Sequence, residues 1–188
     1  IPVPVVQLTE LRLRLVVISD PAVNRDGVAI DDIHIYNNPN GIYDGVTMVS
    51  PVTVNIPGGA DWVDFISPGG KLVASVKSPV QAMGNTDVQA YIHTGSVRIN
   101  SDQFYHNRNI TIKPATVNLT DSASVRFYFL DTETEALINA TGCAYCYKPT
   151  MAYELGETKY SDADDSRENG TLADNLPGNY LFINAGKN

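Results

Sequence analysis

Residues 125–129, "VRFYF", decide the fold class of this chain, because apolar and polar side chains alternate along them. Side chains of a β-strand point alternately to the two faces of a sheet, so Val125, Phe127 and Phe129 share one face. The same alternation occurs in "LRLRL", residues 11–15. We predict that both stretches are strands with one solvated face, and that the apolar side chains of 125–129 face the core.

Similar short segments follow one another along the chain, separated by turn sequences such as "NNPNG", "SPGGK" and "HTGS". Helical periodicity is nearly absent, and only "ETEALINA", residues 133–140, is compatible with a short helix. Many short strands without intervening helices are typical of antiparallel sandwiches. We therefore predict an all-β fold, an antiparallel β-sandwich of jelly-roll or Ig-like type. The predicted strands are 28–36, 46–55, 61–66, 71–77, 87–93, 96–99, 108–113 and 125–129.

A domain boundary is indicated at "YNNPNGIYDG", where Asn, Pro and Gly cluster after a strand. Residues 1–38 supply too few strands to close a core, so we predict that they are the terminal strands of a preceding or incomplete jelly-roll-like module. Residues 39–188 supply enough strands for a sandwich module of their own, with a loop-rich C-terminal part. The first residues show no signal-peptide pattern and read as the middle of a longer protein.

The composition restricts the classes of partner. The chain has 188 residues, 43% of them hydrophobic, a net charge of -8 and a pI of about 4.7. An acidic surface disfavours nucleic acid and anionic membranes, both of which attract basic proteins. No apolar run approaches the roughly 18 residues of a membrane span. We therefore predict no nucleic-acid partner and no membrane insertion, and expect cations or neutral ligands instead.

The two cysteines lie in "GCAYC" as Cys143 and Cys146. This C-x-x-C spacing occurs in redox motifs, in zinc sites and in small disulfide loops. A zinc site needs a second pair of ligands, which the chain does not offer at suitable spacing, and a thioredoxin-like role needs a βαβ context. The pattern favours a structural disulfide, and hence an extracellular or cell-surface location.

Two adjacent aspartates interrupt an apolar strand in "DGVAIDDIHIY", residues 26–36. Because side chains alternate between faces, either Asp31 or Asp32 lies on the buried face. A buried carboxylate is costly unless it is hydrogen-bonded, paired or bound to a metal. Pairing with Arg12 or Arg14 of the preceding strand is one way to satisfy it.

Residues 8–36, with the stretch "LRLRLVVISDPAVNRDGVAIDDIHIY", resemble the closing hairpin of MAM-like jelly-roll modules. In those modules a G-x-A-I-D-D-I strand ends the domain. The chain is also similar to segments of large secreted or cell-surface Bacteroidetes proteins of the type IX secretion class. There, "GIYDGVTM", "RNITIKPA" and "YELGETKYSD" look like parts of the next sandwich module. The resemblance implies an all-β extracellular protein.

The resemblance also implies a structural calcium ion, because an aspartate of the last strand often helps to hold one in such modules. That role falls on Asp31 or Asp32, with Asp20, Asn24 and Asp26 of the preceding turn as further oxygen donors. Calcium takes six to eight oxygen ligands, more than one strand provides. Calcium binding and arginine pairing both remain open for these carboxylates.

A second acidic cluster occurs in "YSDADDSRENG", residues 160–170. Asp162, Asp164, Asp165 and Glu168 are spaced as in a calcium-binding loop, but their register does not fit an EF-hand. The alternative interpretation is a solvated acidic turn.

No catalytic motif is present in the sequence, which has no G-x-S-x-G elbow, no H-E-x-x-H and no glycine-rich phosphate loop. We therefore predict a non-catalytic extracellular β-sandwich segment of a large surface or secreted protein, with a structural or adhesive role. Its expected partners are polysaccharides or other surface proteins.

Two alternative functions follow from the aromatic and apolar residues. In a carbohydrate-binding or accessory module of a secreted hydrolase, Trp62 and residues 103–109, "QFYHNRN", would form a platform for sugar rings. Trp62 also fits a core position beside Phe65. In a fibre subunit, the apolar start "IPVPVVQL" would add to an edge strand of a neighbouring copy.

Overall fold

The computed structural model describes residues 41–59, 61–117 and 120–183. The chain divides into two units, residues 1–39 with Asn188 and residues 40–187, and every described residue belongs to the second. The predicted strands at 11–15 and 28–36 therefore lie outside the described residues. Within the described part, no helix has the length and apolarity needed to span a bilayer.

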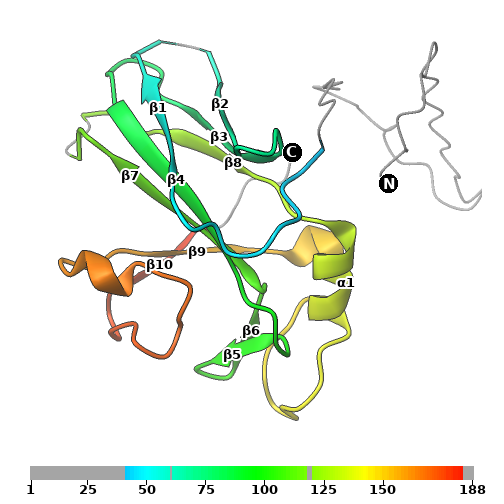
Figure 1. Ribbon diagram of the computed structural model, residues 1–188. Helices are drawn as coiled ribbons and strands as arrows, with labels where there is room; N and C mark the ends of the chain where they lie inside the picture. The colour runs from blue at the N-terminus through cyan, green and yellow to red at the C-terminus, as the bar shows by residue number, and fades with distance from the viewer. Residues whose placement is uncertain (1–40, 60, 118–119, 184–188) are drawn as a thin grey trace, which may run out of the picture. The chain divides into compact units, whose positions relative to one another are not determined.

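Two antiparallel three-stranded sheets form the body of the described unit (Figure 1). The first sheet contains, in spatial order, β1 (Val52–Ile56), β4 (Gly84–Ile92) and β7 (Arg108–Pro114). The second contains β2 (Val63–Ile66), β3 (Leu72–Lys77) and β8 (Ser124–Phe127). Only β2 and β3 are both consecutive in the chain and paired within these two sheets, so the connections from β1 to β2, from β3 to β4 and from β7 to β8 pass from one sheet to the other.

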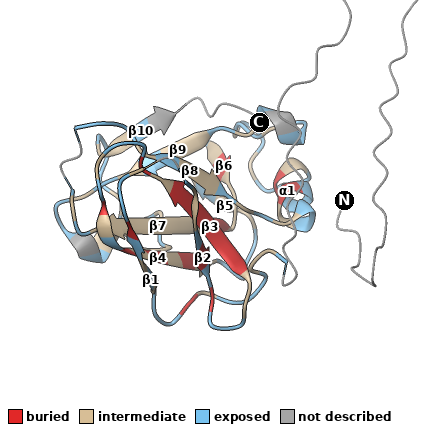
Figure 2. Cartoon of the chain, turned by 90° about the horizontal axis from the view of Figure 1, so that it is seen from above, coloured by how far each residue is buried: buried red, intermediate tan, exposed pale blue. Residues whose placement is uncertain are grey.

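The hydrophobic core lies between these two sheets. On β4, Thr86, Val88 and Ala90 are fully buried and alternate with partly exposed residues. The facing sheet contributes Phe65 and Val76, also fully buried. Figure 2 shows the buried residues concentrated on β3 (red). Inner faces from both sheets thus share one apolar cluster, which makes the fold an all-β sandwich, as the alternation predicted.

The prediction for residues 125–129 is correct in part. Val125 packs against the core, and Phe127 lies opposite the buried Ala74 on the same face, but Phe127 is 36% exposed and lies outside the core. Phe129 lies beyond the strand and is 38% exposed, so it does not face the core as predicted. β8 is an edge strand that ends at Phe127, and the chain then leaves the sheet toward the helix. Phe129 instead contacts the ring of His106, with centroids 5.1 Å apart.

Smaller elements extend the sandwich at one end. A hairpin joins β5 (Arg98–Asn100) to β6 (Gln103–Tyr105) through Ser101 and Asp102, which have φ angles of 49° and 60°. Positive φ at both central residues is the geometry of a type I′ turn, which matches the twist of a hairpin. The remaining elements are α1 (Asp131–Ile138), the 3₁₀ helices η1 (Ala152–Glu154) and η2 (Asp165–Arg167), and the antiparallel pair β9 (Glu157–Tyr160) and β10 (Tyr180–Ile183).

A second, smaller core lies under α1. It consists of Phe104 from β6, Leu137 from α1 and Ala140, with Cys143 and Cys146 packed against it. The predicted helix at 133–140 is present but displaced by two residues toward the N-terminus, and it buries Thr134 and Leu137.

The predicted aromatic platform does not form. Phe104 and Arg108 are only 3% and 8% exposed, so residues 103–109 are not an exposed surface. Trp62 lies on the outer side of the second sheet rather than in the core, with the guanidinium of Arg126 3.9 Å from its ring centroid and Lys77 Nζ at 5.4 Å. Phe65 is fully buried in the core, as expected.

Candidate functional site

The acidic stretch forms a loop, residues 161–170, between β9 and β10, which we call the acidic loop. Side chains of the first sheet and of β5 hydrogen-bond to its backbone. These hydrogen bonds are Thr111 Oγ1 to the Glu168 carbonyl (3.1 Å), Asn109 Nδ2 to the Asn169 carbonyl (3.0 Å) and Arg98 Nη1 to the Gly170 carbonyl (3.0 Å). In addition, Lys113 Nζ forms an ion pair with the Glu168 carboxylate (3.8 Å).

Gly170 is required for this close approach. A Cβ atom added at Gly170 would lie 2.9 Å from Cβ of Tyr91 on β4, which is closer than two such carbons approach in folded proteins. The loop backbone can therefore touch the sheet only with glycine at this position.

Most of the predicted metal ligands of the acidic loop accept hydrogen bonds from the protein itself. The Asp162 side chain is 4% exposed, accepts from the Tyr160 hydroxyl (2.5 Å) and from Asn179 Nδ2 (3.1 Å), and lies 3.6 Å from Arg167. The hydrogen bond from Tyr160 is the largest of several contacts that lower the pKa of Asp162 to about 2. Asp162 thus ties β9 to the segment before β10 as an anion.

Asp164 and Glu168 are used in the same way. Asp164 Oδ1 accepts from the backbone and the hydroxyl of Ser166, and these bonds lower the pKa of Asp164. Glu168 Oε1 accepts from the backbone N–H of Asp162 (3.0 Å). Asp165 begins η2. Across residues 41–59, 61–117 and 120–183, no three His, Cys, Asp or Glu side chains gather as a metal site would require.

The predicted calcium ligands of the N-terminal segment, Asp20, Asp26, Asp31 and Asp32, lie outside the described residues. Calcium binding there and at the acidic loop stays a prediction.

A groove of about 320 Å³ lies between the acidic loop and the outer face of the first sheet, and we call it the sheet–loop groove. Its floor is formed by Asp87, Gln89 and Tyr91 of β4 with Thr111 and Lys113 of β7. Ser166, Glu168 and Asn169 of the acidic loop form one wall. The sequence alone did not indicate this groove, because nothing local shows that a loop 57 to 60 residues after its contacts on β7 covers the sheet.

The cysteines form the predicted disulfide, with an S–S distance of 2.03 Å. The surrounding residues 141–148, the disulfide loop, are also hydrogen-bonded to β6 and to the turn directly before it: the Phe104 N–H donates to the Tyr147 carbonyl (2.9 Å) and the Tyr147 N–H to the Asp102 carbonyl (2.8 Å). The side chains of Tyr145 and Tyr147 are nevertheless 90% and 76% exposed. The loop therefore presents two aromatic side chains on a backbone that is held in place.

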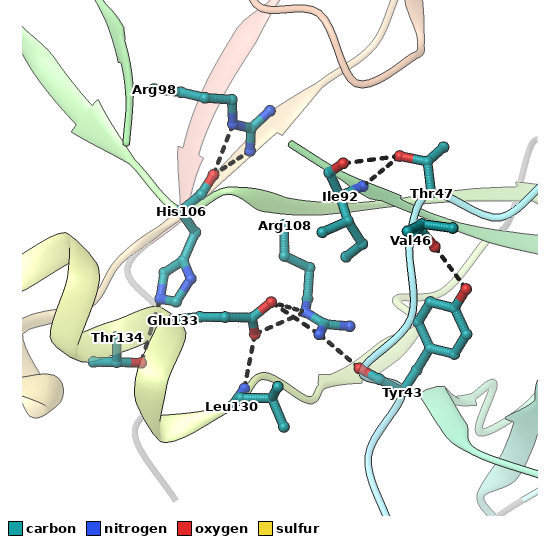
Figure 3. Close-up of polar contacts among 10 residues, drawn as sticks. All are labelled: Tyr43, Val46, Thr47, Ile92, Arg98, His106, Arg108, Leu130, Glu133 and Thr134. Carbon is teal, nitrogen blue, oxygen red and sulfur yellow. Dashed lines mark hydrogen bonds and ion pairs between the residues drawn. The ribbon is translucent and has the colours of Figure 1, made fainter. Parts of the chain in front are cut away.

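A buried polar cluster joins α1 to β7 (Figure 3). The guanidinium of Arg108, 5% exposed, donates to both carboxylate oxygens of Glu133 (2.9 to 3.1 Å) and to the Tyr43 carbonyl (2.6 Å). Glu133 also accepts from the backbone N–H of Leu130 (2.8 Å) at the start of α1. This arrangement holds Glu133 between a cation and a helix N-terminus, which stabilises its charge and fixes the helix to the sheet.

His106 lies beside this cluster. Its carbonyl accepts from the guanidinium of Arg98, and its Nε2 is 3.4 Å from the Thr134 hydroxyl (Figure 3). Burial lowers the pKa of His106, and the nearby Arg108 and Arg98 lower it further against the opposing effect of Glu133. These effects together favour the neutral form of the imidazole, which packs under α1.

Searches of protein-family models, of curated proteins and of solved structures found no match to this chain.

Proposed function

We propose that this chain is a non-catalytic extracellular β-sandwich segment of a larger secreted or cell-surface protein, and that it acts in adhesion to other surface proteins. The observation that carries the proposal is the disulfide loop, which exposes Tyr145 and Tyr147 on a fixed backbone.

Exposed tyrosines on a rigid loop are suited to protein recognition. Tyrosine is enriched in the cores of protein interfaces and gives a large contact area for few rotatable bonds. Because the disulfide and the two hydrogen bonds to β6 already order the loop, binding costs less conformational entropy there. This order supports a role for Tyr145 and Tyr147 as anchors for a partner.

The disulfide also supports the proposed location. Disulfides persist in oxidising compartments and are rare in reducing ones. Cys143 and Cys146 are bonded and pack against the small core under α1, where the bond has a structural setting.

The proposal is tested with the full chain immobilised on beads. Bead retention under flow is measured on surfaces coated with collagen, with fibronectin and with serum albumin. We expect retention on a matrix protein above that on albumin. A Tyr145→Ser/Tyr147→Ser double variant is expected to lower this retention by about tenfold, since interface tyrosines are frequent hot spots.

The matched control is a Val49→Ser/Val117→Ser double variant. These residues are 98% and 76% exposed and do not belong to the disulfide loop, so the control removes the same number of exposed side chains elsewhere in the chain. Its retention should equal that of the unmodified chain. The proposal is wrong if the tyrosine variant is retained as well as the unmodified chain, or if neither matrix protein retains the beads better than albumin.

A further inference from the structure

We propose that the sheet–loop groove is a binding site for a neutral saccharide, holding one or two sugar rings of a longer chain. This inference concerns a surface separate from the disulfide loop and does not depend on the adhesive role of the tyrosines there.

The floor of the groove has the composition of a sugar site. The outer face of the first sheet carries only polar side chains and one aromatic ring, because the apolar residues of β1, β4 and β7 point to the core. Carboxylate, amide and hydroxyl groups occur next to one another as Asp87, Gln89 and Thr111. Such groups bind adjacent hydroxyls of a sugar, each of which is both a donor and an acceptor.

Tyr91 provides a flat apolar surface within this polar floor. Its hydroxyl donates to Gln89 Oε1 (3.1 Å), two residues back on the same face of β4, so the ring lies along the strand. Its Cβ packs against Gly170 at the other end. A ring held at both ends offers a face to the C–H side of a sugar.

The polar groups are also fixed before any ligand arrives. Gln89 Nε2 donates to the Met48 carbonyl (2.7 Å), and Asp87 Oδ1 accepts from the Thr53 hydroxyl (2.5 Å). These bonds leave capacity, because an amide nitrogen has two hydrogens and a carboxylate has two oxygens with about four acceptor sites. The wall is equally fixed by its contacts with β5 and β7. Preorganised sites bind with a smaller loss of entropy.

Charge and size select the class of saccharide. Two carboxylates, Asp87 and Glu168, and one ammonium group, Lys113, line the groove of a chain with net charge -8. This balance repels sulfated sugars, uronic acids and nucleotides. The volume of about 320 Å³ lies at the lower end of the range for small-molecule sites, roughly 300 to 1,000 Å³, which fits a short neutral segment.

The test is a titration of the ¹⁵N-labelled full chain, followed by amide shifts in NMR spectra. The neutral probes are cellotetraose, chitotetraose, maltotetraose and mannotetraose, and the anionic probe is tetragalacturonate, each at millimolar concentration. We expect at least one neutral probe to shift the amides of Gln89, Tyr91 and Thr111 in a saturable way, and tetragalacturonate to leave them unchanged.

Variants then localise the binding. Tyr91→Ala removes the platform and Asp87→Asn removes the carboxylate while keeping its shape. Each is expected to weaken binding about tenfold, the effect of losing one well-placed contact. The matched control is Asn85→Ala, on the same face of β4 but outside the groove, which should leave the affinity unchanged. The spectrum of each variant shows whether it is folded. Asp87→Asn is a nearly isosteric change, so it still tests the proposal if Tyr91→Ala does not fold.

Three outcomes would overturn the proposal. In the first, no neutral probe shifts the groove amides. In the second, tetragalacturonate binds there at least as tightly as the neutral probes. In the third, saturable shifts occur only elsewhere, for example at Tyr145 and Tyr147, and Asp87→Asn leaves the affinity unchanged.

Discussion

Arg108 is a cation inside a small protein, and its surroundings show how that charge is accommodated. It begins β7, where alternation places its side chain under α1 rather than in solvent. Removing a guanidinium from water has a large desolvation free energy, which is offset only when its hydrogen bonds are remade within the protein. Glu133 and the Tyr43 carbonyl remake most of them. The cluster is therefore stable only as a complete set.

We predict that Arg108→Ala lowers the free energy of unfolding by about 3 to 5 kcal/mol, because it leaves Glu133 buried without its cation. The measurement is urea denaturation. The matched control is Lys71→Ala, which removes an ion pair with Asp44 of 3.3 Å whose side chains are 37% and 53% exposed. That change should cost less than about 1 kcal/mol. Equal losses for the two variants would show that burial of the Arg108 pair does not matter.

At the scale of elements, one carboxylate of the acidic loop, that of Asp162, links β9 to the segment directly before β10. Asp162 receives hydrogen bonds from Tyr160 on β9 and from Asn179, directly before β10. The low pKa of Asp162 means that the folded state stabilises its carboxylate anion more than the unfolded chain does. In an unfolded chain the pKa of an aspartate is about 3.9. A lowered folded-state pKa adds stability above the unfolded value, and this stability is lost as pH falls toward the folded one.

We therefore predict that the β9–β10 pair opens between about pH 4 and pH 2, measured by hydrogen exchange of its amides and by the carboxyl ¹³C shift of Asp162. Tyr160→Phe removes the main cause of the shift, so the Asp162 pKa should rise toward its usual value. Because the folded and unfolded pKa values then lie closer together, the opening of the pair should depend less on pH in this range. Tyr145→Phe, which removes an exposed hydroxyl elsewhere, is the control. A titration of Asp162 unaltered by Tyr160→Phe would contradict this account.

For the whole molecule, local patterns predicted the layers but not how distant segments meet. The predicted strands 71–77 and 108–113 match β3 and β7 almost to the residue. The same pattern predicted the face of Phe127 but not its 36% exposure, because alternation does not reveal that a strand lies at an edge. The sheet–loop groove and the pair of Arg108 with Glu133 depend on contacts between residues far apart in sequence, which periodicity cannot encode.

The predicted binding of calcium concerns the whole molecule, because its effect is measured as a change in the melting temperature. An ion bound only by the folded state stabilises it by RT ln(1 + [L]/Kd), so calcium should raise the melting temperature and a chelator should lower it. Asp31→Asn and Asp32→Asn should abolish the response if the site lies there. Pairing with Arg12 or Arg14 would be favoured if calcium leaves the melting temperature unchanged while acidification below about pH 4 lowers it.

The anchoring of the disulfide loop has a mechanical consequence. A tether attached at Tyr145 pulls through the Cys143–Cys146 bond and the two hydrogen bonds to β6, and only then reaches the small core of Phe104 and Leu137. That core is separate from the cluster between the two sheets. Under load we expect the region under α1 to yield first, as local unfolding proceeds in the least buried unit. The unfolded segment would then lengthen the tether while the two sheets stay packed, so that this end of the protein would dissipate part of the applied force.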